Sequence, residues 1–201
     1  MSRRLGFLGL LFTLVAPVHV SADWLITPFV GIKFGGAGCP CPNIPFAVLV
    51  DPEDAAGLRK FTYGGSFGLL TDGILGIDAD FAHIPGYFNR EGAPNTVDTS
   101  TVITLTGNVV LAVPASVSRD GLRPYLVGGG GWMRVSRAGF VRILNPTSNR
   151  VALNIGGGAL GRLSNRSSVR FELRRFTDIG APDTDLGLSF WRATVGVAFR
   201  Y

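Results

Sequence analysis

Apolar and polar residues alternate through the last segment of the chain, from Trp191 to Tyr201. Aromatic and branched residues fall on one parity, whereas the other parity carries Arg192, Arg200 and small residues. Successive side chains of a β-strand point to opposite faces, so this segment is predicted to be a strand with one apolar and one polar face. The apolar face continues to the final residue and needs a partner along its whole length, and a lipid bilayer is a natural one.

Seven further segments show the same period of two, so the pattern predicts eight strands in all. They are Trp24–Phe34, Lys60–Leu70, Ile74–Ile84, Ser100–Val113, Arg123–Val135, Arg150–Gly161, Ser168–Phe176 and Trp191–Tyr201. The first, third, fifth and seventh connections are expected to be long and the others shorter; the fifth is expected over 136–149 and the fourth over 114–122. An even number of strands with alternating long and short connections is typical of outer-membrane barrels.

Backbone groups in lipid must pair with one another, so a sheet that spans a membrane has to close on itself. The predicted fold class is therefore all-β, an eight-stranded antiparallel transmembrane β-barrel. A soluble eight-stranded barrel would show the same alternation with its apolar residues inside. Aromatic residues near the strand ends favour lipid instead: Trp24, Tyr63, Trp132, Trp191 and Tyr201. The facing of the fifth strand is ambiguous from the sequence.

The N-terminus has the organisation of a secretory signal. Arg3 and Arg4 precede an apolar run over residues 5–18, and small residues follow up to Ala22. The run is shorter than the roughly 20 residues that a spanning helix needs. We therefore predict a signal peptide over 1–22 and one barrel domain over 23–201, exported to the bacterial outer membrane.

Composition supports an exported membrane barrel. Charged residues make up 16% of the chain, against about 25% in ordinary soluble domains. Loss of the signal lowers the formal net charge of +5 by two, and the basic residues are spread out rather than clustered. Nucleic acid is therefore not an expected partner, whereas outer-membrane lipid is.

The predicted polar faces carry charged residues of both signs. An eight-stranded barrel is only just wide enough for its own side chains, so charges inside it have to be paired. We expect an interior charge network formed by Lys33, Asp78, Asp80, Arg170, Glu172, Arg174, Arg192 and Arg200. A wide aqueous pore is not expected; a narrow path for ions or small solutes stays open as an alternative.

Few residues suggest chemistry, and no cofactor is expected. His83 is the one histidine of the mature chain, but neither Ser66 nor Ser100 stands at a spacing that indicates a catalytic pair. Cys39 and Cys41 could form a strained disulfide in an oxidising compartment, pair with another chain, or stay free. Two thiols without a nearby histidine are too few for a closed zinc site.

Four segments carry a resemblance to the small outer-membrane β-barrel family of the OmpA/OmpX type: residues 24–31, 123–131, 170–176 and 195–201. The resemblance covers essentially the whole mature chain. It implies that Val195, Val197, Phe199 and Tyr201 form the signal that the barrel-assembly machinery recognises during insertion. Tyr201 is a departure, because phenylalanine is commoner at that position.

The resemblance implies a non-enzymatic protein with a structural, envelope-integrity or adhesion-like role through its external loops. A narrow porin-like channel is the alternative, and a lipid-modifying enzyme is a third possibility. The expected contact surfaces are the loop with Cys39 and Cys41 and the loop with Asp178, Asp183 and Asp185. The sequence indicates no particular surface ligand.

Overall fold

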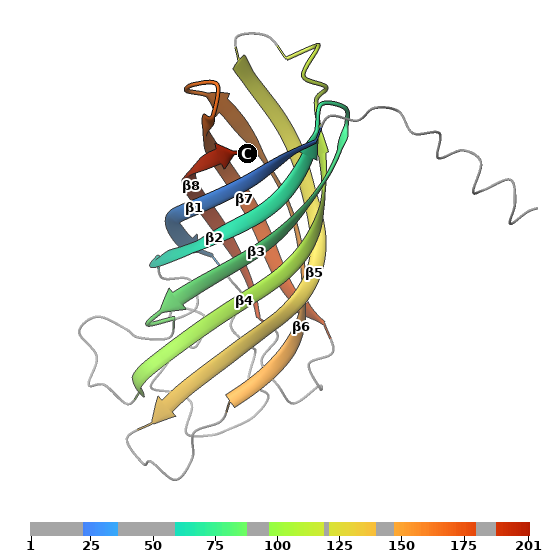
Figure 1. Ribbon diagram of the computed structural model, residues 1–201. Helices are drawn as coiled ribbons and strands as arrows, with labels where there is room; N and C mark the ends of the chain where they lie inside the picture. Colours follow the sequence, from blue (N-terminus) through green and yellow to red (C-terminus); the bar gives the residue numbers. More distant parts are fainter. Residues whose placement is uncertain (1–21, 36–58, 88–96, 119–120, 140–146, 180–187) are drawn as a thin grey trace, which may run out of the picture.

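The chain forms a closed antiparallel β-barrel in a computed structural model that describes residues 22–35, 59–87, 97–118, 121–139, 147–179 and 188–201 (Figure 1). Its strands are β1 Ala22–Phe34, β2 Lys60–Thr71, β3 Leu75–Pro85, β4 Val97–Ala112, β5 Leu122–Gly139, β6 Thr147–Arg162, β7 Ser167–Ile179 and β8 Ser189–Arg200. The strand number and the fold class agree with the prediction from the sequence. In the described residues no helix is long and apolar enough to span a membrane.

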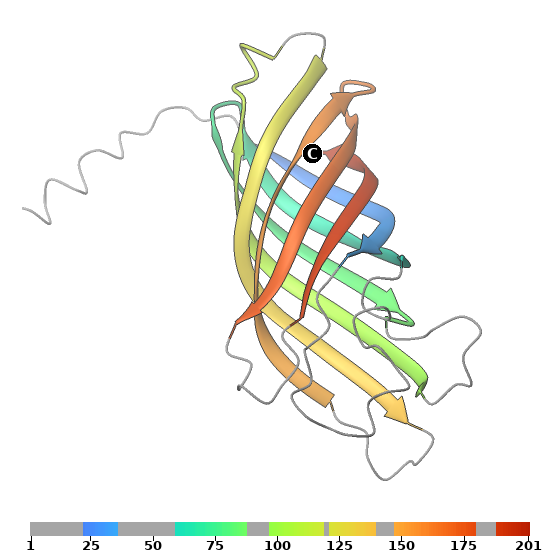
Figure 2. The same ribbon diagram turned by 180° about the vertical axis from the view of Figure 1, so that it is seen from behind.

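Each strand pairs with its neighbour in the chain, and β8 returns to pair with β1. Figure 2 shows β6, β7 and β8 completing the wall on the far side from the view of Figure 1. The backbone of the last residue takes part in this closure: Tyr201 N–H donates to the Trp24 carbonyl at 3.0 Å, and Trp24 N–H donates to the Tyr201 carbonyl at 3.2 Å. Each of the eight described strands is therefore paired with a neighbour on both sides, so none of them is an edge strand.

Several strands, among them β4, β5 and β6, run further than the apolar pattern indicates. The β4–β5 and β5–β6 ladders continue to Val97, Gly139 and Thr147. The fifth connection is therefore 140–146, shorter than the fourth connection at 113–121, so the predicted alternation of long and short connections is wrong at this point. Because pairing between backbone groups does not depend on apolar side chains, the ladder can extend beyond the residues that show the hydrophobic pattern.

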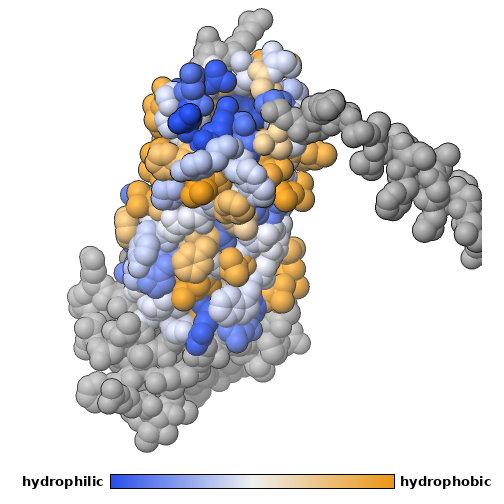
Figure 3. Space-filling model, in the orientation of Figure 1, coloured by the Kyte–Doolittle hydropathy of each residue, from blue (hydrophilic) through white to orange (hydrophobic). Residues whose placement is uncertain are grey.

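The wall has an apolar outer face. Large aliphatic residues are widely exposed there, among them Ile77 at 62% and Ile155 at 70%, while Lys33 and Arg174 are fully buried inside. Figure 3 shows hydrophobic residues over the barrel wall and hydrophilic residues gathered toward the end with the short turns. This is the opposite of a soluble barrel, in which apolar side chains fill the interior and polar ones face water.

The structure also assigns the facing of β5. Arg123, Tyr125 and Val127 point inward and are buried, whereas Leu126 and Trp132 are exposed on the outer face.

The glycine run of β5 brings neighbouring backbones close together. A Cβ atom on Gly129 would collide with the carbonyl oxygen of Gly107, and one on Gly131 with that of Leu105. Outward-facing Gly107, by contrast, has open space around its missing side chain. Glycine at 129 and 131 therefore permits a close approach of backbones at the wall that no other residue allows.

Arg123 ties two turns together at the short-turn end. Its Nε donates to the carbonyl of Val113 at 2.7 Å, and its Nη2 donates to those of Thr71 at 2.8 Å and Gly73 at 2.7 Å. The β2–β3 and β4–β5 connections thus share one buried guanidinium, a contact that the sequence pattern does not indicate.

Candidate functional site

Charged side chains gather in the middle of the barrel. β3 presents two acids inward at alternate positions, β7 presents three charges in the same way, and β8 adds one arginine. Together they form the interior network, which consists of Asp78, Asp80, Arg170, Glu172, Arg174 and Arg192. Alternation along each strand sends all six to one face, and closure of the barrel brings the strands opposite one another.

Glu172 and Asp78 are the acceptors at the centre of the interior network. Glu172 accepts from Arg170 Nη2 at 2.7 Å and from Arg174 Nε at 2.5 Å. Asp78 accepts from Arg170 Nη1 at 3.0 Å and from Arg174 Nη2 at 3.1 Å. Two arginines and two carboxylates therefore form a closed ring of ion pairs, in which removal of one member leaves a buried charge without its partner.

Arg192 completes the charge balance on the other side. Its Nη2 lies 2.8 Å from each carboxylate oxygen of Asp80. Its Cζ lies 5.1 Å from the Phe29 ring centroid and 4.7 Å from that of Phe176. These cation–π contacts with two aromatic rings stabilise the part of the guanidinium that makes no further hydrogen bond. Three carboxylates face three guanidiniums, so the interior network is neutral.

Neutral side chains extend the interior network across the barrel. Tyr125 Oη donates to Glu172 at 2.8 Å and accepts from Arg170 Nε at 2.7 Å. Asn108 Nδ2 donates to Asp78 at 2.9 Å, and Asn154 Nδ2 donates to Asn108 Oδ1 at 2.7 Å. None of these neutral residues was predicted to belong to the site. The period of two that starts at Arg123 assigns Tyr125 to the inward face, so that pattern could have identified it.

Gly158 makes the position of Tyr125 possible. The two residues are opposite one another in the β5–β6 ladder, and a Cβ at 158 would lie 2.5 Å from the phenol oxygen. The phenol can therefore reach the centre of the barrel because its cross-strand neighbour has no side chain.

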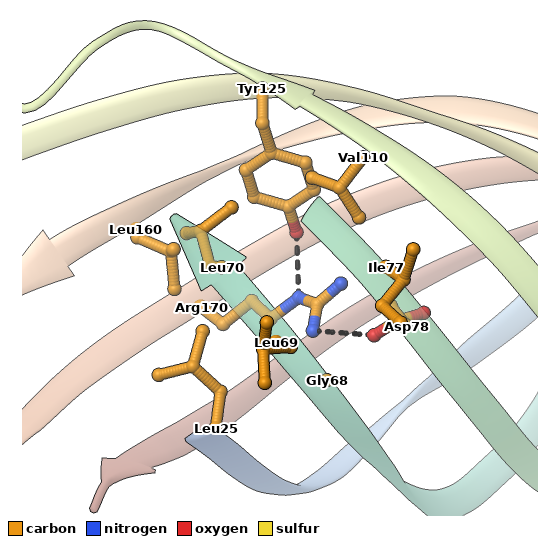
Figure 4. Close-up of a pocket in the computed structure, with 10 residues that line it drawn as sticks. All are labelled: Leu25, Gly68, Leu69, Leu70, Ile77, Asp78, Val110, Tyr125, Leu160 and Arg170. Carbon is orange, nitrogen blue, oxygen red and sulfur yellow. Dashed lines mark hydrogen bonds and ion pairs between the residues drawn. The ribbon is translucent and has the colours of Figure 1, made fainter. Parts of the chain in front are cut away.

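Two clusters of buried apolar residues lie in the barrel interior, one on each side of the interior network. The loop-side cluster consists of Ile84, Tyr87, Val102, Met133, Val135, Ala152, Phe176, Leu188 and Phe190. The turn-side cluster consists of Leu25, Leu70, Val110, Ala112, Tyr125, Val127, Leu160 and Ala198. Figure 4 shows Arg170 between Tyr125 and Asp78, with aliphatic side chains of the turn-side cluster around them. The cavity there is about 20 Å³, close to the space of a single water molecule.

Lys33 and Arg200 lie outside the interior network that the sequence predicted to include them. Lys33 is buried further toward the long connections, with its Nζ 4.2 Å from the Tyr87 ring centroid. Arg200 lies at the short-turn rim, where its Nε is 3.1 Å from Asp23 and about a third of each side chain is exposed. Both residues have the inward parity, but parity says nothing about height along the barrel, and their heights separate them from the other charges.

His83 is placed on the outer part of the wall, and its Nδ1 lies 2.7 Å from Tyr63 Oη. Ser66 points inward and accepts from Arg170, so it is on the opposite face of the wall from His83. Ser100 is also an inward, buried residue. Neither serine is therefore placed to be activated by this histidine.

Other predicted site residues divide between the described and undescribed parts of the chain. Val195, Val197 and Phe199 are exposed on the outer face together with Tyr201. Asp178 is not a free loop residue, because it pairs with Arg150 at 2.7 Å and accepts from Leu188 N–H at 2.9 Å.

Residues 1–21, Cys39, Cys41, Asp183 and Asp185 lie outside the described residues. Within the described part, no group of three or more His, Cys, Asp or Glu side chains could hold a metal ion.

Comparison with known proteins identifies the fold. No family model matches the chain, and no curated protein matches its sequence. Neisserial surface protein A is similar in structure, with a TM-score of 0.63 and 12% identity over 90% of this chain and 99% of that one. OprG from Pseudomonas aeruginosa has a TM-score of 0.58 and 11% identity over 90% and 97%. Ail, the attachment invasion locus protein of Yersinia pestis, has a TM-score of 0.51 and 11% identity over 90% and 99%. The chain therefore has the fold of small outer-membrane β-barrels.

Proposed function

We propose that this protein is an integral protein of the bacterial outer membrane, exported by residues 1–22, whose sealed barrel serves as a rigid anchor. Its role is structural or surface-interactive: it contributes to envelope integrity or adhesion by presenting the long connections at the cell surface. The observation that carries the proposal is the combination of an apolar outer face with an interior filled by the neutral network between two apolar clusters.

Insertion into lipid is supported by the outer face. Exposed aliphatic and aromatic side chains cover all eight strands, and in water each would lose the hydrophobic stabilisation that lipid provides. The C-terminal residues 195–201 end on this face, where the barrel-assembly machinery could recognise them as the resemblance implies. The long connections then lie on the external side and the short turns on the periplasmic side.

The sealed interior favours an anchor over a channel. An ion crossing the barrel would have to pass both apolar clusters and displace the ion pairs between them. Burial of an ion without compensation costs many kcal/mol, so the closed conformation presents a high barrier.

Two measurements test the membrane barrel and the absence of conduction. The mature chain is folded into phospholipid vesicles and run on a gel with and without boiling, and we expect the unboiled protein to migrate differently. The same preparation in planar bilayers should show no discrete conductance steps. A general porin inserted into the same planar bilayers is the positive control for detecting conductance steps. Regular steps from the unmodified protein would overturn the anchor in favour of the channel.

The surface role needs a separate test on whole cells. Cells that produce the protein are compared with cells that produce a variant in which residues 180–187 are replaced by a Gly-Ser linker of equal length. We expect both proteins to be heat-modifiable and the variant to show reduced attachment to host-cell surfaces or reduced envelope resistance to detergent. Equal attachment and equal resistance would argue that this connection is not a contact surface.

A further inference from the structure

Two arginines of the described strands lie on the apolar outer face without an ion pair to a described residue, Arg134 of β5 and Arg175 of β7, and Arg175 is the one that contacts a tryptophan of the next strand. Arg175 of β7 has the same facing as Phe171 and Leu173 and is exposed. Its neighbours in the adjacent strands are Ile155 of β6 and Trp191 of β8. Its one described contact is with Trp191, whose ring centroid is 5.9 Å from the guanidinium carbon. A permanent positive charge therefore lies on a surface that contacts lipid. Placing such a charge there costs free energy unless an anion accompanies it.

No acidic side chain that the structure describes is available to Arg175. Three carboxylates belong to the interior network, two are paired elsewhere, and the last is in the β2–β3 turn at the opposite end. The carboxylates of the interior network are Asp78, Asp80 and Glu172. Asp178 is paired with Arg150, and Asp23 is paired with Arg200. Asp72 is the residue in the β2–β3 turn. The counter-charge of Arg175 therefore has to come from outside the described barrel.

The height of Arg175 in the wall indicates the source of that charge. Trp191 lies near the loop-side start of β8, and in the β1–β8 ladder it is opposite Phe34, the last residue of β1. Tryptophan favours the boundary between hydrocarbon and headgroups. Long connections are external in outer-membrane barrels, so this boundary belongs to the outer leaflet. A long side chain at this height can place its charge among headgroups while its methylenes stay in lipid.

We infer that Arg175 and Trp191 form a binding site for the phosphate group of an outer-leaflet glycolipid, with the indole packed beside the sugar or the first acyl carbons. The planar guanidinium matches a phosphate with two parallel hydrogen bonds, which an ammonium cannot do. This inference rests on the proposed membrane location and adds a lipid class and a position to it.

The test uses the mature chain folded in a neutral maltoside detergent, with Trp24→Phe and Trp132→Phe so that Trp191 is the sole tryptophan. Lipid A that carries its phosphates and lipid A from which they have been removed are titrated separately, and Trp191 fluorescence reports binding. We expect the phosphorylated form to bind about tenfold more tightly, the effect of a charge-assisted hydrogen bond. Arg175→Gln should abolish the difference, and Arg175→Lys should retain part of it.

Arg162→Gln is the matched control, because Arg162 is an exposed arginine at the short-turn end of β6. This variant should keep the full preference for phosphorylated lipid. Equal affinities of the unmodified protein for the two lipids, or an unchanged preference in Arg175→Gln, would overturn the inference. Every variant is first checked for heat-modifiable mobility in vesicles. A protein that does not form a barrel refutes the proposed function, whereas a folded barrel without phosphate preference refutes only the lipid site.

Discussion

Replacing Glu172 by leucine should destabilise the barrel more than any other single change in the interior network. Glu172 accepts hydrogen bonds from Arg170, Arg174 and Tyr125, and its carboxylate is also 4.0 Å from Arg192. Leucine has a similar volume but accepts no hydrogen bond, so the interior is left with three guanidiniums and two carboxylates. Breaking a buried ion pair by removing one partner costs about 3–5 kcal/mol. For a chain of this size that corresponds to a fall in Tm of roughly 6–20 °C.

The assay is the temperature at which the unboiled, folded gel band disappears after incubation in vesicles. Glu172→Gln keeps the acceptor oxygen and the shape, so it should lose less stability than Glu172→Leu. The double variant Glu172→Leu with Arg170→Leu removes one charge of each sign, and it should recover part of the loss. The reasoning fails if Glu172→Leu leaves the transition within about 2 °C, or if the double variant is less stable than the sum of the two single changes.

Three further changes probe other parts of the barrel. Gly131→Val should greatly lower the yield of heat-modifiable protein, because its side chain would collide with the Leu105 carbonyl, whereas Gly107→Ala has open space and should fold normally. Arg123→Ala removes a guanidinium that donates to three carbonyls of two turns. We therefore expect Tm to fall by roughly 5 °C in the same gel assay. An unchanged Tm would contradict the role assigned to Arg123. Tyr125→Phe leaves Arg170 and Glu172 paired but removes the hydroxyl that binds both. It should lower the free energy of unfolding by about 1–3 kcal/mol, measured by urea unfolding in vesicles. A midpoint equal to that of the parent protein would show that the hydroxyl is dispensable.

Parity along the strands was open to prediction because it depends only on local geometry. The alternation from Trp191 to Tyr201 assigned Arg192 to the inside and Phe199 to the outside, and both have that facing in the structure. The same local rule placed Asp78, Glu172 and their neighbours on inward faces. The number of strands follows equally directly, since each segment carries its own period of two.

Contacts between strands could not be predicted in this way. Arg174 and Asp78 are 96 residues apart in the sequence but form a hydrogen bond. Whether their side chains meet depends on how far each strand is displaced along its neighbour. The same displacement places Arg200 at the rim beside Asp23 and places Lys33 beside Tyr87. Lys33 and Arg200 nevertheless have the same inward parity as the residues of the interior network. A period of two carries no information about height in the barrel.

Consecutive residues are therefore enough to predict eight two-faced strands with charged residues on the inner face, because alternation is a local property. Which charges meet, which way β5 faces and how far its ladder extends toward Gly139 depend on the folded barrel. Those features are set by register and closure, which arise from hydrogen bonds between segments that are distant in the chain. The function proposed here depends on them, since a neutral network sealed between two apolar clusters exists only once the barrel has closed.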